Sequence, residues 1–494
     1  MQPYRNSFRH VMKATSLFGG VQVFNILISI VRSKFIALFI GPTGMGIASL
    51  FNTTLNVVDA VTNLGLNRSA VKDISYAKEN YEANKIARTI HILKRLVWFT
   101  AVIGAVLMMI TSPWLSEIAF ESKEYTVSFI WLSLALLFKQ FTHSNLAVLQ
   151  GLQKLGNLAK ANLVGNTVGL LITVPLYYFF RIDAIVPAII IASLISFAIT
   201  LYYTNKTKVE KVPLTNKEAF SEGKDMIQLG VTLSVSSVIT LLAAYIIQIY
   251  ISNEGGVDVV GFYNAGMVIL NTYVGLVFNA MSTDYFPRLS AVSNAIEKIR
   301  NIVFEQAYIA VLLIVPIIVV FVAFAPFFIT LLYSQEFTPT VQFVSWGILG
   351  MLFKAVSFSL GYIIIAKGDS KVFIKTAIGF NSILVFMNII GYTYWGLEGL
   401  GISYFIYFII HFIVVWIITY YRYNFTFKKE FYYIFGISIV LCGVSFLLSY
   451  LEDDVLKYVS LSVMILISSI FSVYYIDKKI VIRDLIQNFF RRKK

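Results

Sequence analysis

Charged side chains are scarce in this sequence. Asp, Glu, Lys and Arg make up only 13% of its 494 residues, whereas soluble proteins carry about 25%. At the same time, 58% of the residues are hydrophobic. A water-soluble globule of this length would need more polar surface, so the composition indicates a polytopic membrane protein.

Cysteine and catalytic motifs are also lacking. The single Cys442 excludes an internal disulfide and a cysteine-based zinc site. The four histidines show no ligand-like spacing, and the sequence contains no HExxH, Walker A or GxSxG motif. We therefore expect no bound metal, no cofactor and no enzymatic activity.

Long connections between the apolar runs are missing as well. A membrane span needs about 20 apolar residues, and the sequence holds fourteen candidates, centred near residues 28, 55, 102, 138, 169, 193, 238, 270, 317, 352, 384, 409, 441 and 466. Basic residues gather in alternate connections and acidic residues in the others. The positive-inside rule then predicts that both termini face the cytoplasm. Because the net charge of +14 lies in these short loops, it does not indicate a nucleic-acid partner.

An internal repeat relates two parts of the chain. Residues 138–166 and 353–381 align without gaps at a constant shift of 215, which pairs Lys160 with Lys375. Each half contributes six spans, so the halves share one orientation and are related by an axis along the membrane normal. We predict an all-α polytopic membrane protein of about 14 transmembrane helices. Its predicted parts are an N-terminal six-helix lobe (1–205), a cytoplasmic linker (206–225), a C-terminal six-helix lobe (226–421), and two extra helices with a basic tail (422–494).

Ionisable residues inside the spans are the candidate functional residues, because a charge near the bilayer centre costs roughly 2.5–3.5 kcal/mol. Arg32, Lys139 and its repeat-mate Lys354 lie too deep to snorkel easily, and mid-span acids are too few to pair with all of them. We expect these three cations to line a water-filled cavity. Arg and Lys together attract anions, so the implied substrate is anionic and membrane-borne, such as a lipid diphosphate.

Several other charges allow two interpretations. Arg68 and Arg288 lie near inner helix ends, where they either snorkel or contribute to the substrate site. Asp284 lies one turn from Arg288 and either pairs with it or couples an ion. Asp59 sits on a polar stripe of one helix face and is either structural or ion-coupling. We expect His143 to form a contact between two helices.

Two more features of the spans lead to structural predictions. Arg32 and Lys34 are two residues apart, so they point roughly 200° from each other around a helix. We expect Arg32 at the cavity, while Lys34, also a candidate for substrate binding, pairs with a neighbouring helix or reaches the outer surface. The GxxxG pattern at Gly165 and Gly169 predicts close helix packing.

Two stretches of the sequence carry a family resemblance. The segments "RSKFIALFIGPTGMGI" (Arg32–Ile47) and "STDYFPRLS" (Ser282–Ser290), together with the two-lobe repeat, resemble Wzx-type O-antigen translocases. These belong to the multidrug/oligosaccharidyl-lipid/polysaccharide exporter superfamily. At the motif positions, the resemblance implies functional roles for Arg32, Lys34, Asp284 and Arg288. Fourteen spans, rather than the twelve typical of enterobacterial members, leave the subfamily and the glycan open.

The resemblance implies a flippase of the bacterial inner membrane. It would move an undecaprenyl-diphosphate-linked oligosaccharide, such as an O-antigen repeat unit, from the cytoplasmic to the periplasmic leaflet by alternating access. Asp59 and Asp284 would link transport to H⁺ or Na⁺, as in an antiporter. The implied partners are this substrate, membrane lipids, a glycan polymerase and a chain-length regulator.

Two other functions fit the sequence less well than the flippase. A cation-coupled multidrug exporter of the same superfamily takes cationic or neutral compounds, for which a lysine-rich cavity has the wrong sign. A membrane sugar polymerase or ligase needs a substantial outer loop for its catalytic groups, and the predicted outward loops are all short.

Overall fold

A computed structural model describes residues 2–79, 83–207, 209–210 and 212–479, without the side chains of 2–23, 79, 83, 279–280 and 282–284. All regular elements of these residues are helices. In chain order they are α1 (Gln2–Thr62), α2 (Leu66–Glu79), α3 (Ala83–Phe120), α4 (Thr126–Gly151), α5 (Leu155–Phe180), η1 (Arg181–Ala184), α6 (Ile185–Asn205), α7 (Asn216–Glu222), α8 (Lys224–Gly255), α9 (Val257–Val268), the π-helix η2 (Ile269–Val274), α10 (Leu276–Ala291), α11 (Ile296–Leu332), η3 (Gln335–Phe337), α12 (Thr340–Ala366), α13 (Ser370–Tyr423), α14 (Lys429–Leu448) and α15 (Asp454–Asp477).

The prediction of an all-helical membrane protein with fourteen spans is confirmed. Ten helical segments of the described residues are long and apolar enough to cross a membrane. Three of them, Phe24–Thr62, Leu155–Asn205 and Ser370–Tyr423, turn back on themselves and hold two spans each. With α4, which is 26 residues long and carries Lys139, the number of crossings is fourteen.

Residues with a positive φ angle make these reversals possible. A straight α1 of 61 residues would be about 90 Å long, roughly three times the hydrocarbon thickness. Gly41 breaks it with φ 63° and ψ −168°, a region that is essentially reserved for glycine. Gly396 does the same in α13 with φ 56° and ψ −137°.

The two halves of α13 show how tightly such a reversal packs. Ser403 Oγ donates a hydrogen bond to the carbonyl oxygen of Met387, 16 residues earlier, at 2.7 Å. A Cβ atom on Gly391 would lie only 2.4 Å from the carbonyl oxygen of Gly399. The chain therefore doubles back where small residues let the two backbones approach each other closely.

The described helices form two compact units. One, which we call the N-terminal unit, comprises Met1–Asn264 with Leu332–Ser334, and the other, the C-terminal unit, comprises Ala265–Leu331 with Gln335–Lys494. The predicted lobes 1–205 and 226–421, the linker 206–225 and the appended 422–494 follow the sequence repeat and remain a prediction.

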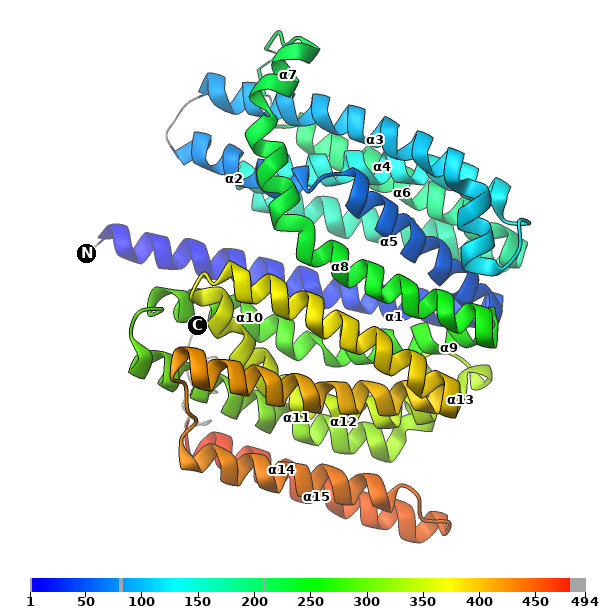
Figure 1. Cartoon of the computed structure of the whole chain (residues 1–494), viewed down its shortest axis with the longest axis vertical. Helices are drawn as coiled ribbons and strands as arrows, with labels where there is room; N and C mark the ends of the chain where they lie inside the picture. Colours follow the sequence, from blue (N-terminus) through cyan, green and yellow to red (C-terminus); the bar gives the residue numbers. More distant parts are fainter. Residues whose placement is uncertain (1, 80–82, 208, 211, 480–494) are drawn as a thin grey trace, which may run out of the picture. The chain divides into compact units, whose positions relative to one another are not determined.

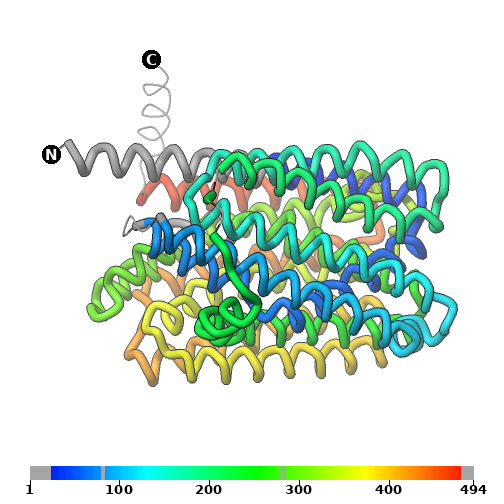
Figure 2. Tube along the Cα trace, turned by 90° about the horizontal axis from the view of Figure 1, so that it is seen from above, coloured from blue at the N-terminus to red at the C-terminus, as the bar shows by residue number. Residues whose placement is uncertain are grey.

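The N-terminal unit is held together by apolar helix faces. Within it α3 packs on α4, α4 on α6, and α5 on both α6 and α1 (Figures 1 and 2). An aromatic cluster fixes one end of this bundle, where the Phe51 ring contacts those of Phe120 and Phe129 with centroids 5.2 Å apart. α2 packs on α3, α4 and α8.

In the C-terminal unit, α11 is the most apolar helix. Its buried residues run from Ile299 to Ile329, as expected for a helix that is hydrophobic all round. α12 packs against α13, and α14 lies beside α15 (Figure 1). The C-terminal unit is thus built mainly of apolar helices that pack on one another.

We expect Gly41→Ala to destabilise the protein by about 1–3 kcal/mol, because alanine does not tolerate the backbone angles of the reversal. Thermal unfolding of the purified protein in detergent measures the loss. Gly436→Ala in α14 is the matched control, since an added Cβ meets no atom within 4 Å there, and it should leave the midpoint unchanged or raise it. Equal midpoints for Gly41→Ala and the control would contradict the strain argument.

Candidate functional site

Two adjoining cavities lie within the N-terminal unit, and both are lined by Asn56, Lys139 and His143. The first has a volume of about 350 Å³, lies among α1, α4, α5 and α6, and reaches Arg32. The second has a volume of about 380 Å³, lies among α1, α2, α4 and α8, and reaches Asp59 and Arg68. We refer to the two together as the N-unit cavity.

Lys139 lies where the two cavities meet. Its Nζ donates a hydrogen bond to Asn56 Oδ1 at 2.5 Å and is 3.4 Å from Asp59 Oδ2. Asn56 and Asp59 are one turn apart on α1, so both face α4. The side chain of Asp59 is only 6% exposed, and Lys139 provides the opposite charge that a buried carboxylate needs.

His143 joins the same group from the next turn of α4. Its Nδ1 lies 3.5 Å from Asp59 Oδ2, and Asp59 Oδ1 has no hydrogen-bond partner among the described atoms. The carboxylate therefore faces one amine and one imidazole. A carboxylate, an amine and an imidazole in contact can exchange a proton among themselves and with water in the cavity.

Arg32 enters the N-unit cavity from the first half of α1. Its Nη2 donates a long hydrogen bond of 3.5 Å to the carbonyl oxygen of Asn166, and its Nε has no partner among the described residues. The protein therefore leaves hydrogen-bonding capacity of this guanidinium unsatisfied. The planar fork of an arginine matches two oxygens of a phosphate or carboxylate.

Glycines on α5 make room for this side chain. A Cβ on Gly169 would lie 3.6 Å from Arg32 Nη2, and a Cβ on Gly165 would come no closer than 3.9 Å to Ser196 Oγ. Both glycines line the cavity. A Cβ on Gly165 would also lie 4.0 Å from the backbone Cα of Ser196 on α6, whereas the neighbour of Gly169 is Arg32. The close helix packing expected at this GxxxG pattern stays a prediction.

The two remaining candidate residues of the N-terminal unit, Arg68 and Lys34, have different surroundings. Arg68 lines the N-unit cavity, and its Nη1 donates to the carbonyl oxygen of Leu233 at 2.8 Å. Lys34 does not line it, and its Nζ instead donates to the carbonyl oxygen of Tyr333 at 2.6 Å. Arg32 and Lys34 therefore point to different surroundings, in agreement with their angular separation.

In the C-terminal unit, Lys354 on α12 is held by a different set of groups. Its Nζ donates to Asn271 Oδ1 at 2.9 Å, and the hydroxyl of Tyr404 donates to the same oxygen at 3.0 Å. The rings of Phe278 and Phe408 lie with their centroids 5.8 Å and 5.2 Å from the amine, within cation–π range. Asn271 belongs to the π-helix η2, a conformation that is frequent at functional sites.

The two lysine–asparagine pairs are related by the sequence repeat. Lys139 bonds Asn56, Lys354 bonds Asn271, and the partners are 83 residues apart in both cases. The shift of 215 that maps Lys139 to Lys354 therefore also maps one asparagine to the other. The same shift places Val274 opposite Asp59 and Phe358 opposite His143, so the repeat keeps the amine and its amide but not the acid and the imidazole.

Two candidates near the motif "STDYFPRLS" remain as predictions. Arg288 forms an ion pair with Glu305, with Nη2 and Oε2 3.2 Å apart. The side chain of Asp284 lies outside the described residues, so neither its proposed pairing with Arg288 nor its proposed ion coupling can be placed.

Sequence reasoning missed the roles of Asn56 and Asn271, whereas the helix–helix contact expected for His143 is present, between α4 and Asp59 of α1. The asparagines could have been found, because the constant shift of 215 relates them as it relates the lysines. The position of His143 four residues after Lys139 signalled one common helix face. No sequence signal pointed to the backbone carbonyls that receive Arg32, Arg68 and Lys34.

Within the described residues, no group of three or more His, Cys, Asp or Glu side chains is arranged to hold a metal ion. The charged part of the N-unit cavity thus consists of Arg32, Lys139 and Arg68 against the single carboxylate of Asp59, with His143 beside it. An arrangement of this sign attracts anions.

The fold of the chain is shared with solved structures of known proteins. Over 95% of its length the chain shares the fold of the lipid II flippase MurJ in an inward-closed conformation (TM-score 0.69, 16% identity, 99% of that chain). Over 82% it shares that of an inward-facing MATE-family multidrug resistance transporter of the MOP superfamily (TM-score 0.67, 14% identity, 94% of that chain).

The family follows from the sequence itself. Residues 35–342 match the model of the polysaccharide biosynthesis protein family, so the chain belongs to that family. It is also 26% identical over 360 residues to a putative O-antigen transporter of Shigella flexneri, covering 70% of this chain and 82% of the relative. The resemblance to O-antigen translocases drawn from the two motifs is thereby confirmed at the level of the family and the fold.

We expect Lys139→Ala to destabilise the protein by about 1–3 kcal/mol, because it leaves the buried Asp59 carboxylate without its cation. The double variant Lys139→Ala/Asp59→Asn should regain most of that loss, since it removes the uncompensated charge as well. Thermal unfolding of both variants, with Asp59→Asn alone as the third corner of the cycle, measures the coupling. Strictly additive effects would show that the two side chains do not interact.

Proposed function

We propose that the protein is a flippase for a lipid-linked oligosaccharide. Its substrate would be an undecaprenyl-diphosphate-linked glycan, an O-antigen repeat unit or a similar surface glycan, moved from the cytoplasmic to the periplasmic leaflet. The observation that carries the proposal is the N-unit cavity, in which three cations face one carboxylate within a membrane protein of polysaccharide biosynthesis.

The cations of the cavity suit a diphosphate. Arg32 offers a fork of donors, and Lys139 a compact charge. An arriving phosphate oxygen would compete with Asn56 Oδ1 and Asp59 for the Lys139 amine, which lies between them. Arg68 would extend the same positive surface toward α2. Lys354, which is paired with a neutral amide, would supply a further cation from the C-terminal lobe.

The other parts of the substrate have matching surroundings. Amide and hydroxyl groups of Asn52, Asn166, Ser193 and Ser196 line the first cavity, and such groups bond sugar hydroxyls. The polyprenyl chain would stay in lipid. In the proposed cycle the two lobes alternate between an inward-open and an outward-open state around the diphosphate site.

We propose Asp59 as the residue that couples transport to H⁺ or Na⁺. Binding of an anion by Lys139 would weaken its pairing with Asp59, and the carboxylate would then gain affinity for a proton or cation. His143, 3.5 Å from the carboxylate, would relay the proton. Asp284 and Arg288 remain further candidates for coupling and substrate binding, and Lys34 for binding.

The proposed location is the bacterial inner membrane with both termini in the cytoplasm, as the charge of the loops predicts. A glycan polymerase and a chain-length regulator are the protein partners that such a substrate implies. A multidrug exporter of the same fold is the alternative. Cationic drugs would meet a cavity of like charge, so drug-resistance profiling of an overexpressing strain distinguishes the two functions.

Removing one of three cations inside the helical spans should strongly reduce transport. We expect Arg32→Ala, Lys139→Ala and Lys354→Ala each to lower translocation roughly ten- to a hundredfold, since each loses a charge-assisted hydrogen bond. Complementation of a flippase-deficient strain measures the effect, with membrane levels checked by immunoblot. Lys123→Ala is the control, because that lysine pairs with Glu117 at an exposed site. Full complementation by all three variants would refute the proposal.

Coupling can be tested separately from binding. We expect Asp59→Asn to retain the substrate but to lose the dependence of translocation on an imposed pH or sodium gradient. Reconstituted vesicles loaded with a fluorescent lipid diphosphate provide the assay, and His143→Gln should lose only the dependence on the pH gradient. A gradient dependence equal to that of the wild type in Asp59→Asn would assign coupling to another residue.

A further inference from the structure

A second positively charged pocket lies outside the N-unit cavity, between α3 and the segment that precedes α7. It has a volume of about 580 Å³, in the range of small-molecule sites. Its lining from α3 consists of His91, Lys94, Arg95, Trp98 and Phe99, and residues 212–216 cover it. We refer to it as the linker pocket.

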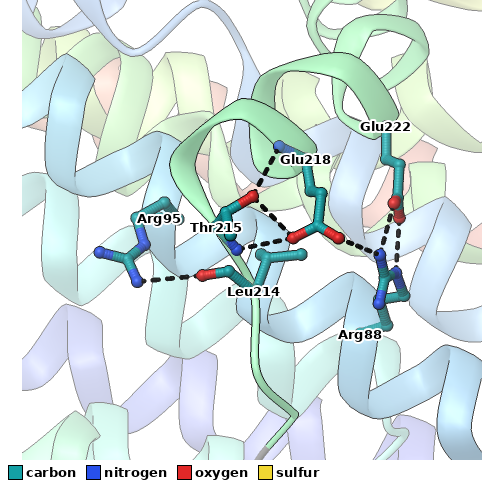
Figure 3. A network of polar contacts seen from close by, with 6 residues as sticks. All are labelled: Arg88, Arg95, Leu214, Thr215, Glu218 and Glu222. Atoms are coloured by element: carbon teal, nitrogen blue, oxygen red, sulfur yellow. Dashed lines mark hydrogen bonds and ion pairs between the residues drawn. The ribbon is translucent and has the colours of Figure 1, made fainter.

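The linker pocket is built by one face of α3. Positions 91, 94, 95, 98 and 99 follow the spacing of three and four residues that aligns side chains along a helix. The covering segment is tied to this face at two points. His91 Nε2 lies 3.1 Å from the carbonyl oxygen of Glu210, and Arg95 Nη2 donates to that of Leu214 at 3.4 Å (Figure 3).

The charge of the pocket is not compensated by its own lining. Arg95 reaches only a neutral carbonyl, Lys94 forms no ion pair within the described part of the chain, and no carboxylate lines the pocket. Arg88, two turns earlier on α3, provides the contrast. Its Nε and Nη2 donate to Glu222 at 2.6 Å and 2.5 Å, and Nη2 lies 3.7 Å from Glu218, as Figure 3 shows.

The two carboxylates of α7, Glu218 and Glu222, therefore interact with Arg88. The hydrogen bond from the Arg88 guanidinium holds the pKa of Glu222 below its usual range, so this carboxylate stays ionised and stays engaged. Glu218 is also used in the capping box of α7 with Thr215. Neither carboxylate lines the linker pocket, so neither lies against Lys94 or Arg95 there.

The apolar side of the pocket indicates its position in the membrane. Trp98 is 51% exposed, and the ring of Phe99 contacts that of Phe220 on α7 at 5.1 Å. Phe220 is itself 46% exposed. Tryptophan beside lysine and arginine is typical of the boundary between headgroups and acyl chains, so cations and apolar rings would meet the two parts of one lipid.

We propose that the linker pocket binds the headgroup of an anionic phospholipid. The phosphate would lie against Lys94 and Arg95, and the upper acyl chains against Trp98 and Phe220. Basic pockets between transmembrane helices bind such headgroups elsewhere. This site is separate from the cavity proposed for the flippase substrate and does not depend on that function. Because residues 212–216 close the pocket, a bound lipid would also hold α7 and its linker against α3.

Tryptophan quenching tests the proposal. The full-length protein is placed in phosphatidylcholine nanodiscs that contain phosphatidylglycerol brominated on its acyl chains, and the signal of Trp98 is the difference between wild type and Trp98→Phe. We expect roughly tenfold preferential quenching of Trp98 by brominated phosphatidylglycerol over brominated phosphatidylcholine. The double variant Lys94→Gln/Arg95→Gln should lose this preference.

Three comparisons make the result decisive. Lys72→Gln/Lys85→Gln removes two exposed cations from α2 and α3 outside the pocket and should keep the preference. Lys94→Arg/Arg95→Lys should keep it as well, which separates loss of charge from misfolding.

Equal quenching by both lipids in the wild type, or an equal loss in the Lys72/Lys85 control, would overturn the proposal. Displacement of the lipid by inorganic pyrophosphate or by a polyprenyl diphosphate at low concentration would overturn it too, since the pocket would then serve a soluble anion or the transport substrate.

Discussion

A cation inside an apolar bundle needs an oxygen atom to receive it, and five cations of this protein show how that need is met. Lys139 and Lys354 use the side-chain oxygens of Asn56 and Asn271. Arg32, Arg68 and Lys34 use backbone carbonyls. A neutral acceptor lowers the cost of burial without cancelling the charge, so the positive potential remains available to an anionic ligand.

The two halves of the sequence repeat surround the same lysine–asparagine pair with different side chains. Both units keep a lysine bonded to an asparagine, but only the N-terminal pair has Asp59 and His143 beside it, where the C-terminal unit has Val274 and Phe358. The amine of Lys354 is surrounded by aromatic rings and a tyrosine hydroxyl. Under the proposed function, the C-terminal lysine would act as a permanent charge, whereas the N-terminal one could change its net charge with the protonation of its neighbours.

Much of this arrangement could be predicted from the sequence. Apolar runs of span length and the alternation of loop charge predicted the fourteen crossings, because each follows from the bilayer and not from tertiary contacts. The depth of Arg32 and Lys139 in their spans pointed to a cavity, and both line it. The inward placement of Arg68 depends on how α2 and α8 pack. In the GxxxG pattern of α5, Gly169 faces Arg32 and Gly165 lies near the backbone of Ser196 on α6, and the sequence could not distinguish these two uses of glycine.

The contact of Lys34 with Tyr333 has a consequence for biosynthesis. The acceptor lies 299 residues further along the chain, and a ribosome adding about 5–20 residues per second needs roughly 15–60 seconds to reach it. Throughout that interval this hydrogen bond cannot form. The tie between the first span and residue 333 is therefore made only late in synthesis.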